Sequence, residues 1–425
     1  MDTFGFSSNR FITHISFPMA SFLFIALLLI QNPTHDSENE IPRISEGIIV
    51  EHTTFFDIRD NRIVGADSLL AALEQAHFVA LGELHNRVRL GELTESLLHI
   101  LEPHGFNNFA IETGPYSARK LQQLVRSGKP EVSEFYAQYS SRLYDLIPIP
   151  FFKGKSDVQF LSAADSLGYE LWGLDQEFYF SYTYLIDELA RLAGESLTVE
   201  QQRLRRKLTR RLYWLDRRNQ LAETINSNFE RSCRLKNDEN LEAYLLSFEK
   251  TDHPDILQIL DALRTTLQIY CLADQGKASS PVRINYFREN FDRNFEAALA
   301  ENPEPKVFLK MGSFHMGRQR SPLNLYDIGN HVHQLAESKG QSTVHIYYLN
   351  RFLEGKDMKG RRGWEGSEIF ISVGDREKWT LIDLRPLREQ LSNGTLSGND
   401  FEVRTIWNYD FIIVAPEDDW VKRHW

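Results

Sequence analysis

The sequence is poor in cysteine: only Cys233 and Cys271 occur among its 425 residues. Two thiols cannot build a disulfide framework or a cysteine-rich zinc site, although they allow a single bridge. Neither cysteine lies in a motif typical of a catalytic nucleophile, so we expect both to have a structural role.

Basic residues are also in short supply, with 48 Lys and Arg against 59 Asp and Glu and a net charge of -11. A general nucleic-acid-binding protein needs a surplus of basic side chains to neutralise phosphates, so we expect no nucleic-acid partner. The 42% hydrophobic content supports a large core and excludes disordered and collagen-like classes. At about 150 residues per domain, the length allows two or three domains, or one large α/β domain with an insertion.

Long apolar runs are absent except at residues 15–30, which carry no charge. This run is shorter than the roughly 20 residues of a transmembrane helix and closer to the core of a signal peptide. Neither a small-residue cleavage site nor a cysteine for lipid attachment follows it directly. We therefore expect residues 1–31 to be a signal peptide or a signal anchor, with a buried core helix as the alternative. The first interpretation predicts export to the cell envelope or medium, with a membrane tether through residues 15–30 if the segment is retained.

Several familiar catalytic motifs are missing. The sequence contains no Gly-x-Ser-x-Gly nucleophile elbow, no His-Glu-x-x-His pair, no Walker A loop and no Gly-x-Gly-x-x-Gly fingerprint. Serine hydrolases with a nucleophile elbow, zinc proteases of the His-Glu-x-x-His type, P-loop enzymes and dinucleotide-binding enzymes are therefore disfavoured.

The pattern of apolar residues predicts an α/β fold. Helical spacing occurs at 93–101, 118–125 and 158–167, and short apolar runs predict strands at 77–82, 108–112, 169–174, 306–311, 343–348, 368–372, 379–383 and 410–414. Strands separated by helices indicate a mainly parallel central sheet flanked by helices. We expect a linker and N-terminal extension at 32–65, the two halves of the α/β domain at 66–179 and 301–425, and a large helical insertion at 180–300.

Polar side chains follow four of the predicted strands where each strand ends. They are Glu83 with His85, Glu112, Asp175 and His315. In open α/β sheets the ligand crevice lies outside the carboxyl ends of the strands, so we expect these side chains to converge.

Glu83 and His85 are two residues apart and should leave the same face of an extended strand. A carboxylate beside an imidazole orients the ring and raises its basicity, which suits a general base that activates water. Together with Glu112 and His315, the set could carry acid–base hydrolysis or bind a divalent metal, and the spacing does not decide between the two. Each residue alone could equally be a cap or turn former, but their coincidence at four strand ends favours a functional site.

Blocks around these residues resemble the erythromycin-esterase-like group and its wider superfamily, which includes ChaN-like haem-binding proteins and Tiki/TraB-type proteins. They span roughly residues 68–415 in the order of the fold, and they are Val79–His85, Gly105-Phe106, Phe109–Glu112, Leu174–Gln176, Tyr286–Glu289, Lys306–His315 and Asn408–Ile413.

The resemblance implies an exported hydrolase that cleaves an ester or related bond of a small molecule and requires no cofactor. It implies His85 as the base, Glu83 and Glu112 as orienting groups, and His315 as a second catalytic or substrate-polarising group. Arg288, on the helix that closes the cleft, would bind substrate together with Asp175.

The motifs also depart from the esterase pattern. One residue separates Glu83 from His85, as in the ChaN-like pattern, where the esterases have two, and Ser313 stands where they commonly have Asn. We therefore assign no macrolide substrate. The alternatives are a ChaN-like carrier that holds haem or a metal in the same cleft, and a metal-dependent hydrolase or protease.

Two charged features lie outside the strand-end set. Residues 203–218 are basic and amphipathic, which is typical of a solvated helix face or of a surface for an anionic ligand or membrane. Lys310 lies inside a predicted strand, where it needs either an ion-pair partner beneath the site or an exposed position.

Overall fold

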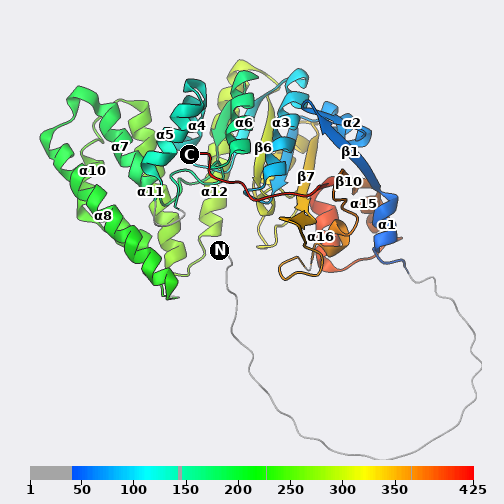
Figure 1. Cartoon of the computed structure of the whole chain (residues 1–425). Helices are drawn as coiled ribbons and strands as arrows, with labels where there is room; N and C mark the ends of the chain where they lie inside the picture. The colour runs from blue at the N-terminus through cyan, green and yellow to red at the C-terminus, as the bar shows by residue number, and fades with distance from the viewer. Residues whose placement is uncertain (1–40, 142–145, 226, 365) are drawn as a thin grey trace, which may run out of the picture. The chain divides into compact units, whose positions relative to one another are not determined.

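The computed structural model describes residues 41–141, 146–225, 227–364 and 366–425 (Figure 1). The apolar run at 15–30, and with it the predicted leader or tether, lies outside these residues. Within the described ranges, no helix combines the length and hydropathy that crossing a bilayer requires.

The helices are α1 (Glu46–Glu51), α2 (Asp67–Gln75), α3 (Val88–Leu101), α4 (Pro115–Ser127), α5 (Lys129–Tyr139), α6 (Lys155–Ser166), α7 (Tyr182–Ala193), α8 (Val199–Thr224), α9 (Arg231–Lys236), α10 (Glu239–Leu246), α11 (Pro254–Asp274), α12 (Ser280–Glu301), α13 (Ile328–Ser338), α14 (Glu368–Ile371), α15 (Arg385–Ser392) and α16 (Asp400–Asn408). The strands are β1 (Thr53–Arg59), β2 (Arg62–Val64), β3 (Phe78–Glu83), β4 (Phe106–Ile111), β5 (Glu170–Gly173), β6 (Lys306–Gly312), β7 (Thr343–Asn350), β8 (Phe352–Leu353), β9 (Lys356–Asp357), β10 (Trp379–Asp383) and β11 (Phe411–Ala415).

A nine-stranded sheet forms the centre of the described chain, in the order β2-β1-β10-β11-β7-β3-β6-β4-β5. All pairs from β11 to β5 are parallel, whereas β2, β1 and β10 join them through antiparallel pairs. This confirms the predicted α/β class with a mainly parallel sheet.

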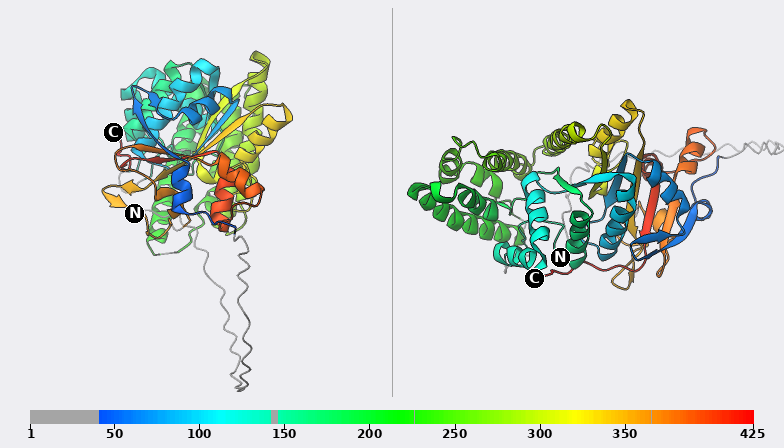
Figure 2. Two further views of the ribbon diagram at one scale, coloured as in Figure 1. Left: turned by 90° about the vertical axis from the view of Figure 1, so that its right-hand side faces the viewer. Right: turned by 90° about the horizontal axis from the view of Figure 1, so that it is seen from above.

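Helices cover both faces of the sheet (Figure 2), and the alternation of side chains along the strands explains why. In β3, Val79 and Leu81 join one apolar cluster with α2, α3, α4 and α6, while Phe78 and Ala80 join a second cluster with α12, α13, α15 and α16. Successive residues of a strand point to opposite faces, so a fully apolar strand such as β3 demands a helical layer on each side.

The order of the strands places a topological switch beside β3. The chain leaves β3 through α3 toward β4, but it leaves β6 through α13 in the opposite direction toward β7. Because right-handed crossovers that run in opposite directions put their helices on opposite faces, a crevice opens at the carboxyl ends of these strands.

The predicted linker and N-terminal extension at 32–65 contains regular structure that sequence reasoning missed. Residues 46–51 form α1, and β1 pairs with β10 at one side of the sheet. The turn between β1 and β2 places Asp60 and Asn61 at positive φ, 49° and 59°, as in a tight hairpin turn. Of the extension, the residues from 46 onward are therefore part of the α/β domain.

The predicted strand at 368–372 is wrong, because residues 368–371 form the short helix α14. Phe370 and Ile371 are fully buried in the second apolar cluster. A run of three apolar residues, 369–371, satisfies either a buried strand or one turn of a buried helix, so its length and periodicity cannot separate the two.

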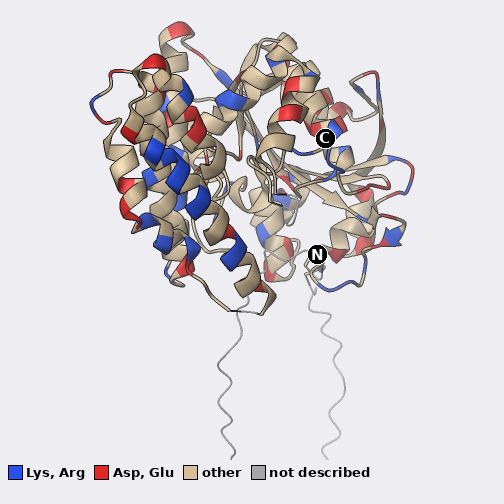
Figure 3. Cartoon of the chain, turned by 60° about the vertical axis from the view of Figure 1, so that its left-hand side comes forward, with Lys and Arg blue, Asp and Glu red and all other residues tan. Residues whose placement is uncertain are grey.

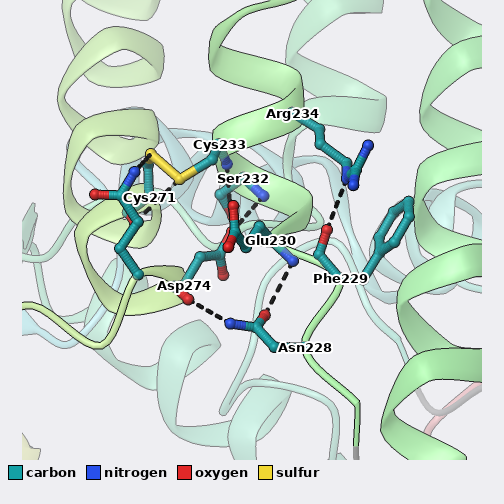
Figure 4. The surroundings of a disulfide bond; sticks show 9 residues. Asn228, Phe229, Glu230, Ser232, Cys233, Arg234, Cys271 and Asp274 are labelled. Carbon is teal, nitrogen blue, oxygen red and sulfur yellow. Dashed lines mark hydrogen bonds between the residues drawn. A yellow bond between two sulfur atoms is a disulfide. The ribbon is translucent and has the colours of Figure 1, made fainter.

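Between β5 and β6 the chain is helical, as the sequence pattern indicates. Helices α7 to α11 pack on one another, whereas α12 lies on the sheet, where Phe291 and Phe295 contact Phe78. Cys233 of α9 and Cys271 of α11 form a disulfide with 4.5 Å between their Cα atoms (Figure 4). Both cysteines are thus structural.

Candidate active site

The polar residues at the four predicted strand ends do converge. Strands β3, β6, β4 and β5 are consecutive in the sheet. Glu83 is the last residue of β3, Glu112 directly follows β4, Asp175 lies two residues after β5, and His315 closes the 3₁₀ turn after β6. Parallel strands end at the same edge of a sheet, which is why positions far apart in the chain meet here.

Glu83 orients the ring of His85. The Oε1 atom of Glu83 lies 3.1 Å from Nδ1 of His85, and because an ionised carboxylate can only accept, Nδ1 carries the proton. Asn86, at a φ of 61°, turns the chain out of the strand direction immediately afterwards. Nε2 of His85 is consequently the nitrogen that can take up or release a proton.

Phe151 covers one face of the His85 imidazole. The two rings stack with centroids 3.8 Å apart and planes inclined by 10°. Phe151 has a φ of 66°, a conformation that costs free energy for an aromatic residue and is concentrated at functional sites. The packing restricts ring rotation of His85 while its side chain stays 27% exposed to solvent.

Glu112 lies between the two imidazoles. Its Oε2 atom is 3.5 Å from Nε2 of His85, and its Oε1 atom is 3.7 Å from Nε2 of His315. The backbone N–H of Gly312 donates to Oε2 over 2.5 Å. Two histidines, one after β3 and one after β6, therefore direct their Nε2 atoms toward one buried carboxylate.

The second imidazole is held like the first. Nδ1 of His315 lies 2.8 Å from Oδ2 of Asp327, and the ring packs edge-on against Phe287 at 5.0 Å. Asp327 is the residue before α13, where its other oxygen accepts from the first N–H of that helix. This carboxylate–imidazole pair was not predicted from the sequence.

Lys310 supplies the buried cation beneath the site. It projects from β6, its ammonium contacts Oε2 of Glu83, and its side chain is 2% exposed. Of the two interpretations of this strand lysine, the ion pair under the site is therefore confirmed.

Arg283 supplies a second cation, in a position that the sequence analysis gave to another arginine. Its guanidinium donates to Glu112 Oε1 at 2.9 Å and to both oxygens of Asp175. Arg288, five residues along the same helix, instead donates to the backbone carbonyl of Tyr326. The structure thus places Arg283, and not Arg288, against the site carboxylates.

The charges around Glu83 and Glu112 lower the pKa of both carboxyl groups. Burial would raise the pKa of Glu83, but Lys310 and His85 more than offset it, so the pKa of Glu83 falls below its usual range. Burial likewise opposes ionisation of Glu112, yet His85, His315 and Arg283 lower its pKa to about 2.

Glu83 and Glu112 in turn change the pKa of His85. Burial would lower the pKa of His85, but Glu112 and then Glu83 raise it above its ordinary value. For Asp175, burial dominates over Arg283 and raises the pKa. The site therefore keeps Glu83 and Glu112 ionised and makes His85 more basic than a free imidazole.

The donor set resembles that of a small cation site, since ligand atoms of Glu83, His85 and Glu112 lie within 4.8 Å of one another. Both carboxylates, however, already have cationic partners, Lys310 and Arg283. A metal ion would have to displace these ion pairs. Haem ligation would require an imidazole Nε2 to turn away from Glu112, so neither group fits the arrangement as it stands.

Two hollows lie near these strands. A small cavity of about 40 Å³ adjoins the site, with Ser313, Tyr347 and Tyr409 in its wall. A larger hollow of about 410 Å³ is lined by α4 and by the beginning of β5, at the opposite end of that strand. The larger one contains none of the convergent residues, and we therefore do not regard it as the reaction site.

Structural comparison identifies this architecture. The sequence matches no protein-family model and no curated protein. In contrast, the described fold superposes on a mutant of the erythromycin esterase EreC in its open conformation, with a TM-score of 0.51 and 17% identity over 84% of this chain and 94% of that one. The chain has the erythromycin esterase fold.

Other solved structures of this fold are more distant. A Bacillus cereus protein gives a TM-score of 0.48 at 17% identity over 84% of this chain and 92% of its own, and a succinoglycan biosynthesis protein gives 0.47 at 14% over 83% and 91%. The erythromycin esterase fold confirms the resemblance seen in the sequence motifs at the level of architecture.

Sequence reasoning missed three contributors to the site: Phe151, Arg283 and Asp327. Pro148 and Pro150 mark an irregular segment before Phe151, but no local signal aims its ring at His85. The four-residue spacing from Arg283 to Phe287 puts both on one face of α12, where the guanidinium lies 5.0 Å above the ring. That face could have been recognised as lining the site only with the strand order known.

Proposed function

We propose that the protein is a hydrolase that cleaves an ester or related bond of a small molecule with water activated by His85. The observation that carries this proposal is the Glu83–His85 pair, in which the carboxylate fixes Nδ1 as the donor and leaves Nε2 as the base. The match to an erythromycin esterase in fold supports the reaction class, and no macrolide substrate is inferred from it.

In the proposed reaction, Nε2 of His85 accepts a proton from a water molecule as that water attacks the carbonyl carbon. Glu112, ionised and 3.5 Å away, stabilises the imidazolium that forms. His315, whose Nδ1 is bound by Asp327, presents Nε2 from the other side of Glu112 and would polarise the substrate or protonate the leaving oxygen.

The disulfide between α9 and α11 supports the proposed compartment. Disulfides persist in oxidising environments and are rare in the reducing cytosol of mesophiles. Cys233 and Cys271 form this bond within the helical region, which agrees with a protein exported through the leader predicted in residues 1–31. We propose the cell envelope or the medium as its location.

Replacement of the base tests the mechanism directly. With a panel of p-nitrophenyl esters as the probe, His85→Asn should reduce turnover by roughly 100-fold to 10,000-fold, the range that a general base contributes. Its midpoint of urea unfolding should remain near that of the native protein. His331→Asn is the matched control, because His331 of α13 pairs with Asp292 of α12 and with none of the site carboxylates.

The pH dependence gives a second readout. The base must be neutral, so kcat/KM should rise with pH through an apparent pKa above 6.5, because the carboxylates raise the pKa of His85. Glu83→Gln removes one of these charges and should move that midpoint to lower pH. If His85→Asn kept turnover close to that of the native protein, the proposed mechanism would be refuted.

Chelation and haem titration distinguish the alternative functions. Hydrolysis by an ionised carboxylate–imidazole pair should persist after exhaustive chelation. Loss of hydrolysis on chelation, with recovery on adding a divalent metal, would favour a metal-dependent enzyme. A saturable Soret band without hydrolysis of any ester would favour a haem carrier.

A further inference from the structure

Helix α8 carries a long cationic face that the proposed reaction does not use. The helix runs from Val199 to Thr224, about 39 Å at 1.5 Å per residue, and its apolar side is buried through Leu204, Leu208, Leu212 and Leu215. Blue segments, which mark Lys and Arg, recur along this helix in Figure 3. The exposed basic residues without a carboxylate partner among the described residues are Arg206, Lys207, Arg210, Arg217 and Arg218.

Large apolar side chains share this exposed face. Tyr213 is 60% exposed, Trp214 40% and Leu221 54%, and Ile225 at the end of the helix is 68% exposed. Residues three and four apart lie on the same side of a helix, so the series 206, 210, 213, 217 and 221 forms one continuous stripe. The stripe therefore alternates positive charge with apolar surface.

The stripe is also held rigidly. Arg211 and Arg218 both lie over the ring of Trp214, at 4.9 and 5.4 Å from its centre. On the buried side, Asp216 binds Arg231 of α9, and α9 is joined to α11 by the disulfide. Helix packing and a covalent bond thus fix a preformed surface, so that binding to it requires little ordering.

The exposed face of α8 has the opposite sign of charge to the chain as a whole. The protein carries a net charge of -11, but the exposed face of α8 is strongly positive. Its complement is a negatively charged surface at least as long as the helix. Nucleic acid would neutralise the arginines but leave Leu221 and Ile225 in water, whereas a bilayer interface accepts basic and apolar side chains together.

We propose that the outer face of α8 docks flat on an anionic lipid bilayer, with Trp214 and Leu221 inserted among the headgroups and the arginines bound to lipid phosphates. The docking does not depend on the hydrolase chemistry.

Vesicle co-sedimentation of the full chain tests the proposal. The native protein should partition more strongly onto phosphatidylcholine vesicles containing roughly 30% phosphatidylglycerol than onto pure phosphatidylcholine vesicles. The triple variant Arg206→Gln, Arg210→Gln, Arg217→Gln should lose on the order of 100-fold in partition coefficient onto the anionic vesicles, because each basic residue near such a surface contributes roughly fivefold. High salt should lower the partition coefficient of the native protein on anionic vesicles by a similar factor, because it screens the same charges.

A matched triple variant controls for net charge. Arg62→Gln, Lys339→Gln and Arg362→Gln make the same charge change at exposed positions on β2, after α13 and before α14, and should leave partitioning unchanged. Trp214→Ser should weaken binding to anionic vesicles without altering its salt dependence. Circular dichroism confirms that each variant is folded.

Three outcomes would overturn the proposal. Equal partitioning onto neutral and anionic vesicles would mean that the N-terminal run alone binds membranes. Equal losses in the two triple variants would mean that only net charge matters. Saturable binding of duplex RNA by the α8 face, without binding to anionic vesicles, would identify nucleic acid as its partner instead.

Discussion

Removal of Lys310 should destabilise the protein severely, because its ammonium is the buried cation that balances Glu83. The two side chains are only 2% and 3% exposed. Lys310→Met preserves most of the apolar stem and removes the ammonium, whose Nζ atom lies 5.9 Å and 5.1 Å from the ring centres of Phe152 and Phe160. The substitution therefore isolates the loss of charge from the loss of volume.

The expected loss of unfolding free energy follows from the unpaired Glu83 carboxylate that Lys310→Met leaves in the core. Breaking a buried ion pair by removing one partner costs about 3–5 kcal/mol, because the remaining charge has neither water nor a counter-ion. Glu83 retains its hydrogen bond to His85, so we expect the lower end, about 3 kcal/mol. Glu83→Gln combined with Lys310→Met removes both charges of this ion pair and should recover about 2 kcal/mol of this loss.

The stability difference between the native protein and Lys310→Met should depend on pH in a defined direction. In the native protein the pKa of Glu83 is lowered, so the ion pair stabilises fully above the ordinary pKa of 4.5 and is lost as pH falls through the lowered value. In Lys310→Met, burial is no longer offset and the pKa of Glu83 should rise. The stability gap between the two proteins should then narrow on acidification, because protonation removes the unpaired charge.

Urea unfolding followed by circular dichroism, at neutral pH and near pH 5, measures these free energies. Arg126→Met is the control, since its partner Asp165 forms a pair in which the arginine side chain is 62% exposed. That variant should lose less than about 1 kcal/mol. A loss below about 1 kcal/mol in Lys310→Met, or a double variant no more stable than the single one, would refute the reasoning.

Two further predictions concern turnover of the ester panel. Arg283→Met should lower kcat/KM on the order of 100-fold, because it releases Glu112 and Asp175 from their common partner; a larger loss in Arg288→Met would contradict the placement of these arginines. Gly312→Ala would bring a Cβ atom to 3.1 Å from both His85 Nε2 and Glu112 Oε2, so it should lower turnover by a comparable factor. Gly47→Ala, whose Cβ would meet only Ser45 at 3.9 Å, is its control, and unchanged turnover in Gly312→Ala would mean that the space beside His85 is not used.

Much of the α/β architecture was readable from the sequence, because buried parallel strands must be apolar throughout. Strand β3 and the strands that flank it, β6 and β7, appear as short apolar runs at the predicted places. The hairpin of β1 and β2 was missed because its strands are half exposed and carry no such run. The helix α14 was mistaken for a strand because its three consecutive apolar residues have no resolvable period.

The candidate site was likewise only partly predictable from the sequence. Glu83, Glu112 and His315 could be chosen from the sequence because each lies at or just after the carboxyl end of a strand, and the local apolar pattern reveals where strands end. Proximity in the chain also paired Glu83 with His85. The chemistry of these residues remains a prediction until the variants are measured.

What the sequence by itself determined is the buried strands of the parallel part of the sheet, their polar carboxyl ends and the amphipathic character of α8, because these depend on residues close together in the chain. Only the tertiary structure decided which cations balance the site and which arginine faces it. Lys310 meets Glu83 because β6 inserts beside β3, and Arg283 faces Glu112 while Arg288 does not because α12 crosses the sheet with one side inward. Strand order and helix rotation are set by packing across the whole core, and no local pattern encodes them.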